Sequence, residues 1–154
     1  MATDPPSNEQ VERFHEQVID LVKKYQFRNR NREICCGLSV SQCYVLETLR
    51  RFGPLSMNNL AEKMHLTIST VTRVLQPLLR RKYVTREEDP DDRRIRLISL
   101  TPQGKAFALE AWKNSLESEK IILSNFPAEN REMLITFIKN LNHAVSQWQS
   151  CCND

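Results

Sequence analysis

The stretch LAEKMHLTISTVTRVLQPLLRRKYVTRE, residues 60–87, passes from a helical to a strand-like apolar pattern. Two runs with apolar residues three and four positions apart flank the turn HLT, and an alternating run follows from residue 83. Two short helices around a tight turn, with a strand directly after them, are typical of a helix-turn-helix that carries a β-wing. Pro77 interrupts the second helix, which we expect to continue with a bend or one loosened turn. The expected inner face of that helix is Ile68, Val71, Val74, Leu75, Leu78 and Leu79.

The wing follows from the next residues along the chain. Residues 83–87 and 94–100 have the composition of strands, and the segment EDPDDR between them (88–93) is dense in turn-forming residues. This pattern predicts a β-hairpin with a long charged tip.

Helices are expected on both sides of this segment. Ser7 and Ser39 each precede a glutamine by three residues, which is the capping-box signature of a helix start. Thr101 followed by Pro102 opens a further helix, because threonine suits the N-cap and proline the first helical position. The predicted fold is therefore mainly α with a small β-hairpin wing, in the order helix, helix, short helix, helix, hairpin, helix, helix. The expected apolar stripe of the helix after Ser39 is Val45, Leu49 and Phe52.

The composition of the 154 residues, 40% apolar and 27% charged, fits a cytoplasmic globular protein of one domain or two small lobes. There is no apolar run of roughly eighteen residues and no secretory signal pattern, so we expect no membrane segment. Five cysteines, two pairs of them adjacent, do not resemble a disulfide framework. The net charge of +3 is weak support for a polyanionic partner, so the distribution of charge matters more.

The polar side of the helix after Thr67 is the first candidate surface. The second helix of a helix-turn-helix enters the major groove of DNA with its N-terminal part. Hydroxyl groups near a helix start suit phosphate oxygens, and Arg73 and Gln76 are long enough to reach base edges. The alternative is a solvated helix face without function. The candidate DNA contacts on this helix are Ser69, Thr70, Thr72, Arg73 and Gln76.

The wing offers a second group of cationic residues. Arg93, Arg94 and Arg96 lie at its tip and in its second strand, and arginine at such a tip can enter a narrow minor groove. The neighbouring Asp91 and Asp92 would repel DNA if free, so we expect at least one of them to pair with an arginine and hold the tip in shape. The alternative is a surface loop whose charges neutralise one another.

Three pieces of the sequence, GLSVSQCYVLETL (37–49), residues 60–87 and DPDDRRIRLISLTPQG (89–104), resemble the winged-helix core of MarR-type transcriptional regulators. The resemblance implies binding to a pseudo-palindromic operator in double-stranded DNA, usually as a repressor. It gives Arg94 the minor-groove contact and Asp92 the supporting role. Pro77 departs from the pattern and puts the straightness of the recognition helix in question.

The terminal helices also agree in placement with this family, and the resemblance implies that they join a homodimer. Their apolar stripes exceed what one small lobe can cover, which favours the same conclusion. The expected organisation is an N-terminal dimerisation helix (1–37), a winged helix-turn-helix domain (38–104) and C-terminal dimerisation helices (105–154).

Cysteine is concentrated at the joint before the second helix, where Cys35, Cys36 and Cys43 fall within nine residues. Because Cys43 lies off the expected apolar stripe, these thiols are candidate ligands of a thiophilic effector ion: Zn(II), Cd(II), Hg(II), Cu(I) or As(III). Cys151 and Cys152 could complete the site from the partner chain. The alternatives are small buried hydrophobic residues, a peroxide or thiol-redox sensor, and control by a phenolic ligand.

No catalytic set is visible. The three histidines are far apart in the sequence, and there is no phosphate-binding glycine loop or pair of carboxylates. We therefore expect no enzyme and no required cofactor. An enzyme acting on small molecules is the alternative of another class, and it would lack steeply salt-dependent binding to duplex DNA.

Overall fold

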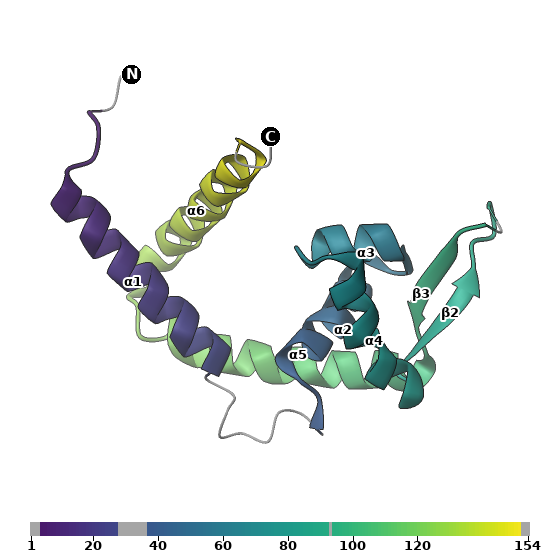
Figure 1. Ribbon diagram of the computed structural model, residues 1–154. Helices are drawn as coiled ribbons and strands as arrows, with labels where there is room; N and C mark the ends of the chain where they lie inside the picture. Colours follow the sequence, from purple (N-terminus) through teal and green to yellow (C-terminus); the bar gives the residue numbers. More distant parts are fainter. Residues whose placement is uncertain (1–3, 28–36, 93, 152–154) are drawn as a thin grey trace. The chain divides into compact units, whose positions relative to one another are not determined.

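A computed structural model of the chain describes residues 4–27, 37–92 and 94–151. The fold is mainly α-helical with one small antiparallel sheet, as the sequence predicts (Figure 1). The chain divides into two compact units, Met1–Ala111 and Trp112–Asp154, with the boundary inside one long helix. The elements are α1 (Asn8–Phe27), α2 (Val40–Phe52), β1 (Leu55–Ser56), α3 (Met57–Lys63), α4 (Ile68–Arg80), β2 (Val84–Glu88), β3 (Arg96–Leu100), α5 (Pro102–Leu123), the 3-10 helix η2 (Ala128–Asn130) and α6 (Arg131–Cys151).

Both predicted capping boxes are confirmed. Ser39 Oγ accepts a hydrogen bond from the amide of Gln42 at 3.3 Å, and the Gln42 side chain accepts one from the amide of Ser39 at 2.9 Å. The same reciprocal pair joins Ser7 and Gln10, with distances of 2.9 and 3.2 Å. These bonds satisfy amides that have no partner within the helix, so each fixes the residue at which its helix begins.

The starts of α4 and α5 are capped by threonines. Thr67 Oγ1 accepts from the amide of Thr70 at 3.3 Å, and Thr101 Oγ1 accepts from the amide of Gly104 at 3.0 Å. Thr101 Oγ1 also donates to the carbonyl of Lys82 at 2.6 Å, which ties the start of α5 to the segment after α4. Pro77 lies inside α4, which remains one helix.

The sheet has the strand order β1-β3-β2, and both strand pairs are antiparallel. The predicted hairpin is confirmed, with Val84 opposite Leu100 at its base and Glu88 opposite Arg96 toward its tip. Strand β1 was not predicted. It contains only two residues, and so short a strand has no alternation that a sequence pattern could reveal.

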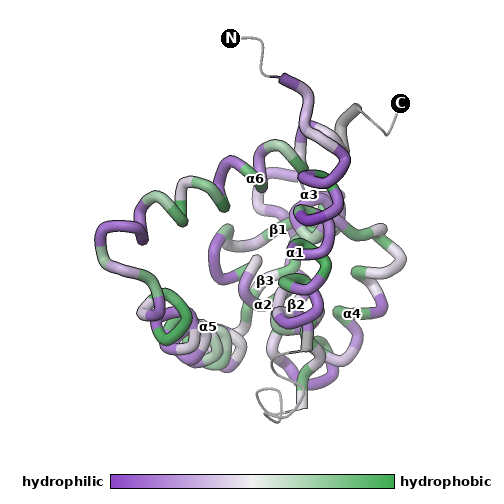
Figure 2. The backbone as a smooth tube through the Cα atoms, turned by 90° about the vertical axis from the view of Figure 1, so that its left-hand side faces the viewer, coloured by the Kyte–Doolittle hydropathy of each residue, from purple (hydrophilic) through white to green (hydrophobic). Residues whose placement is uncertain are grey.

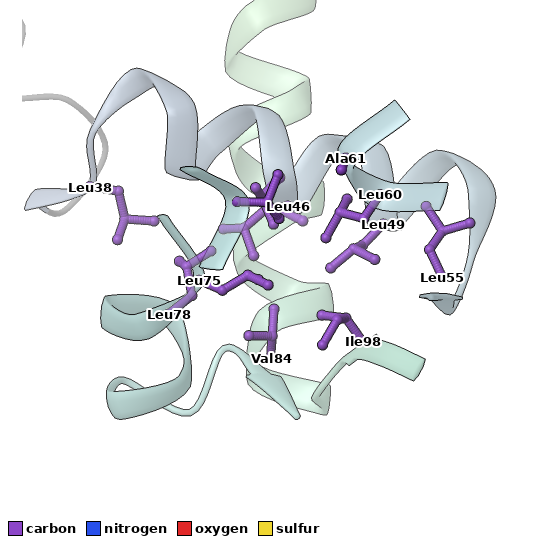
Figure 3. Close-up of a cluster of buried hydrophobic side chains, with 13 residues drawn as sticks. Leu38, Leu46, Leu49, Leu55, Leu60, Ala61, Leu75, Leu78, Val84 and Ile98 are labelled. Carbon is purple, nitrogen blue, oxygen red and sulfur yellow. The ribbon is translucent and has the colours of Figure 1, made fainter. Parts of the chain in front are cut away.

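The core of the first unit is formed where α2, α3 and α4 meet the base of the hairpin. Figure 3 shows leucines of the helices gathered above Val84 and Ile98, whose side chains point up from the strands. Close packing of this kind fixes which face of each helix is turned inward. The side chains with almost no exposed surface are Val45, Leu46, Leu60, Val71, Leu75, Leu78 and Ile98.

Two residues expected in the core lie outside it. Phe52 is 46% exposed, since it is the last residue of α2 and its ring contacts the Lys63 ammonium 4.0 Å from the ring centroid instead. Leu46 belongs to the core with Val45 and Leu49. Ile68 is 50% exposed because it is the first residue of α4, at the end of the helix that projects beyond the buried stripe.

In the second unit, Figure 2 shows hydrophobic and hydrophilic residues alternating along α6. Many of the apolar side chains of α6 are exposed in the single chain, Phe137 and Trp148 most of all. Among the described residues, no helix combines the length and the apolar character that crossing a bilayer requires.

Gly104 gives a test of how α5 docks on the hairpin. A Cβ atom at this position would lie 1.9 Å from the carbonyl oxygen of Tyr83, which is backbone and cannot rotate away. Glycine to alanine inside a helix ordinarily stabilises by about 1 kcal/mol. We expect Gly104→Ala instead to lower the free energy of unfolding by about 3 kcal/mol, measured by urea denaturation.

The neighbouring exposed Gln103 provides the control. Gln103→Ala should change the free energy of unfolding by less than about 0.5 kcal/mol. If Gly104→Ala is as stable as this control, the close approach of α5 to Tyr83 is wrong.

Candidate DNA-binding surface

Helix α4 presents a polar face because its apolar face is packed against α2 and α3. Ser69, Arg73 and Gln76 are exposed on this polar side, while Thr70 and Thr72 are partly buried. The three exposed residues occupy successive turns, so hydrogen-bonding groups run along the helix from its N-terminus. A recognition helix likewise contacts DNA with side chains near its N-terminus.

The hydroxyl groups at the start of α4 are engaged with one another. Thr67 Oγ1 lies 3.0 Å from Ser69 Oγ and 3.0 Å from Thr70 Oγ1. Thr72 Oγ1 donates to the carbonyl of Ile68 at 2.8 Å, so its only hydrogen is used inside the helix. On this face, Arg73 and Gln76 therefore supply the long side chains that can donate hydrogen bonds to an external partner.

Arg73 stands beside the start of α2. Together with Thr70 of α4 and with Ser39, Ser41 and Gln42 of α2, it lines a shallow open hollow of about 290 Å³. Hydroxyl, amide and guanidinium groups therefore border one concave spot next to the recognition helix. Such a border offers hydrogen-bond donors to an anion that lies along this surface.

The wing tip is shaped by hydrogen bonds from aspartate side chains to the backbone. Asp89 Oδ1 accepts from the amides of Asp91 at 2.8 Å and Asp92 at 3.3 Å. Asp92 Oδ1 accepts from the amide of Arg94 at 2.9 Å. Asp92 thus contacts the backbone of Arg94, and Asp89 shares the supporting role without having been predicted. Its signal in the sequence was an aspartate directly before a proline, which favours a turn.

The predicted wing arginines have different surroundings. Arg96 forms an ion pair with Glu88 directly across the two strands, with 3.0 Å between nitrogen and oxygen. Arg94 is exposed and makes no side-chain ion pair with any described residue. Arg93 lies outside the described residues. Of the predicted wing arginines that the structure describes, Arg94 is therefore the one whose guanidinium is not paired with a described carboxylate.

The cysteine site can be followed at one position only. Cys43 is partly buried and packs against the core as a small apolar side chain. Cys35, Cys36 and Cys152 lie outside the described residues, and Cys151 is described only as the last residue of α6. Within the described part of the chain, no three histidine, cysteine, aspartate or glutamate side chains gather at metal-binding distance.

A cavity of about 490 Å³ lies where α2 ends, beside the base of the wing and the first turns of α5. Its apolar wall includes Leu49, Leu100 and Leu109, and its charged lining includes Arg50 and Lys105. Hydrogen bonds from Arg50 to Glu47, at 2.7 and 2.8 Å, raise the pKa of the guanidinium group. The volume falls within the range of pockets that take small organic molecules.

Comparison with known proteins agrees with the helix-turn-helix fold. The sequence model of the MarR family matches residues 38–95. The HTH-type transcriptional regulator YdgJ of Bacillus subtilis is 30% identical over 128 residues, which cover 79% of this chain and 78% of that protein. The HTH-type transcriptional repressor MdtR of the same organism is 32% identical over 68 residues, 44% of each chain. The crystal structure of a probable transcriptional regulator from Pseudomonas aeruginosa superimposes with a TM-score of 0.64 at 28% identity, covering 83% of this chain and 94% of that one.

Asp89 tests the account of the wing tip. Asp89→Ala removes the acceptor of two backbone amides, so we expect hydrogen exchange at the amides of Asp91 and Asp92 to become roughly fivefold faster. NMR measurement of amide exchange gives the rates. Asp91→Ala is the matched control, because the Asp91 carboxylate accepts no hydrogen bond from the described residues, and it should leave the amide of Asp92 unchanged. Equal rates in both variants would contradict the capping role of Asp89.

Proposed function

The chain belongs to the MarR family of transcriptional regulators, and from that premise we propose that it is a repressor whose operator binding is controlled by an effector. It is a DNA-binding protein of the winged helix-turn-helix type. The observation that carries the proposal is the polar face of α4, with Arg73 and Gln76 exposed, together with a wing on which Asp92 accepts a hydrogen bond from the amide of Arg94. A transcriptional regulator acts on chromosomal DNA, which supports the cytoplasmic location expected from the sequence.

We assign the DNA contacts as follows. Arg73 and Gln76 approach base edges in the major groove, and Ser69 and Thr70 contact phosphates near the start of α4. The Thr72 hydroxyl offers only an acceptor, because its hydrogen is bonded inside the helix, so we assign it no DNA contact. Arg94, with Arg93 beside it, enters the minor groove. Arg96 acts through its ion pair with Glu88, which holds the two strands of the wing together.

A homodimer is part of this proposal. Apolar side chains of α1 and α6, among them Phe14, Phe137 and Trp148, are exposed in a single chain, and a second copy would remove them from water. The division into 1–37, 38–104 and 105–154 follows from this assignment of the terminal helices to dimerisation. Two recognition helices related by a twofold axis require a pseudo-palindromic operator with half-sites about one DNA turn apart. Repression is favoured by the similarity to MdtR, which is a repressor.

The effector is proposed to act at the start of α2. Cys43 packs on the core that also holds α4, and a close-packed core transmits small displacements. Ligation of a thiophilic ion by Cys35, Cys36 and Cys43 would pull on α2 and alter the orientation of α4, so that bound ion and bound DNA disfavour each other. Thiol oxidation at the same residues would act on the same helix.

A second candidate effector is a small phenolic or other organic molecule. The cavity of about 490 Å³ supports it, because Ser99 and Leu100 of the wing and Lys105 of α5 all border that space. An occupant there would contact the base of the wing directly.

The DNA-binding proposal predicts a steep dependence of affinity on salt. The affinity for duplex DNA selected by the protein should fall steeply as the salt concentration rises. We expect Arg73→Ala to weaken binding roughly 5- to 150-fold per half-site, which corresponds to the loss of about 1–3 kcal/mol for each base contact. Fluorescence anisotropy at several salt concentrations measures both quantities.

Lys113→Ala is the control for this experiment, since it removes one exposed positive charge from α5, outside the proposed contacts. It should change the affinity less than twofold or so. Binding that does not depend on salt, or equal effects of the two variants, would contradict the assignment of α4 as the reading helix.

The effector proposal is tested by titrating the reduced protein with Zn(II), Cd(II), Hg(II) and As(III) while following thiolate absorption and release from DNA. Replacing Cys35, Cys36 and Cys43 together by serine should abolish both signals if these thiols hold the ion. Treating the wild-type protein and the triple variant with peroxide distinguishes thiol oxidation from metal ligation. An unchanged DNA response of the triple variant to every agent would contradict sensing by these cysteines.

A further inference from the structure

Ile68 is an apolar side chain in an unexpected place. It is the first residue of α4 and is 50% exposed, whereas Val71, one turn further along, is completely buried. The buried stripe of α4 therefore begins after Ile68. This leaves a large aliphatic group at the N-terminal end of the helix that carries Arg73 and Gln76.

The polar groups around Ile68 are already bonded to one another. The Thr67 hydroxyl contacts those of Ser69 and Thr70, and the Thr72 hydroxyl donates to the carbonyl of Ile68 itself. The first turn of α4 is thus held by its own side chains. Its free external surface includes the branched side chain of Ile68.

A β-branched residue at this position is suited to a fixed contact, because its side chain has few conformations. Branching at Cβ restricts the χ1 angle of isoleucine, so its methyl groups can take few directions from the helix. Little side-chain freedom is lost when such a group is covered. A rigid apolar group on the leading turn of a recognition helix matches an apolar group on the floor of the major groove.

We propose that Ile68 reads the C5-methyl group of a thymine in the operator. Thymine is the base that presents a methyl group in the major groove, and residues at the N-terminus of a recognition helix contact base edges. This inference rests on the proposed function, because it names a specificity determinant of the same surface. Ile68 thereby adds an apolar discrimination to the hydrogen bonds of Arg73 and Gln76.

Replacement of thymine by uracil tests the contact, since uracil lacks only the methyl group and keeps every hydrogen-bonding atom. The operator is first obtained by selection from random duplex DNA with the full-length protein. Each thymine is then replaced by uracil in both half-sites. At one symmetric position we expect binding to weaken about fourfold per half-site, the effect of uncovering one methyl-sized apolar group.

Ile68→Ala should weaken binding to the thymine operator by a similar factor and should bind the thymine and uracil forms of that position equally. Ile68→Val keeps the branch at Cβ and should retain most of the discrimination. Ile95→Ala removes another exposed isoleucine, from the wing, and should leave the discrimination at that position intact. Circular dichroism melting shows that the variants are folded.

The outcomes distinguish a failure of the Ile68 contact from a failure of DNA binding. If the wild-type protein is insensitive to uracil at every position, or if Ile68→Ala keeps the full discrimination, the inference about Ile68 is wrong and DNA binding stands. If selection enriches no duplex at all, the proposed function fails and the inference fails with it.

Discussion

Burial of one face of α4 is the constraint on which the rest of the structure depends. Val71, Leu75 and Leu78 lose all their exposed surface against α2, α3 and the hairpin base. The helix cannot rotate without uncovering them, and fully burying each such side chain is worth about 1.5–3 kcal/mol. The outward direction of Arg73 and Gln76 follows from that packing. Packing of the core therefore turns the polar face outward, and the polar side chains need no contacts of their own to orient it.

The conformation of the wing is determined differently, because its tip is exposed and has no hydrophobic core beneath it. Its conformation is maintained by carboxylates that accept hydrogen bonds from nearby amides, at Asp89 and Asp92. The acidic residues that look unfavourable for binding a polyanion thus serve as turn-forming acceptors. They also leave Arg94 exposed at the tip, while the ion pair of Arg96 with Glu88 links the strands behind it.

Helix α2 connects these features to the proposed control of DNA binding. Its first turn carries Cys43 and borders the hollow beside Arg73, and its last residues border the cavity at the wing base. One helix therefore carries Cys43 and borders both the hollow beside the reading helix and the cavity. The proposed control of DNA binding would act through a displacement of α2 at either end.

The sequence by itself determined the helix starts, the hairpin and the candidate reading face, because capping boxes, turn residues and apolar periods are local signals. Ser39 with Gln42, and Thr101 before Pro102, act within a few residues of the chain. Only the tertiary structure decided which apolar residues are buried. Ile68 and Phe52 fit the helical period, but each lies at a helix end that projects past the core, and a period carries no information on where the partner surface stops. The same holds for β1, whose two residues are a strand only because β3 lies beside them.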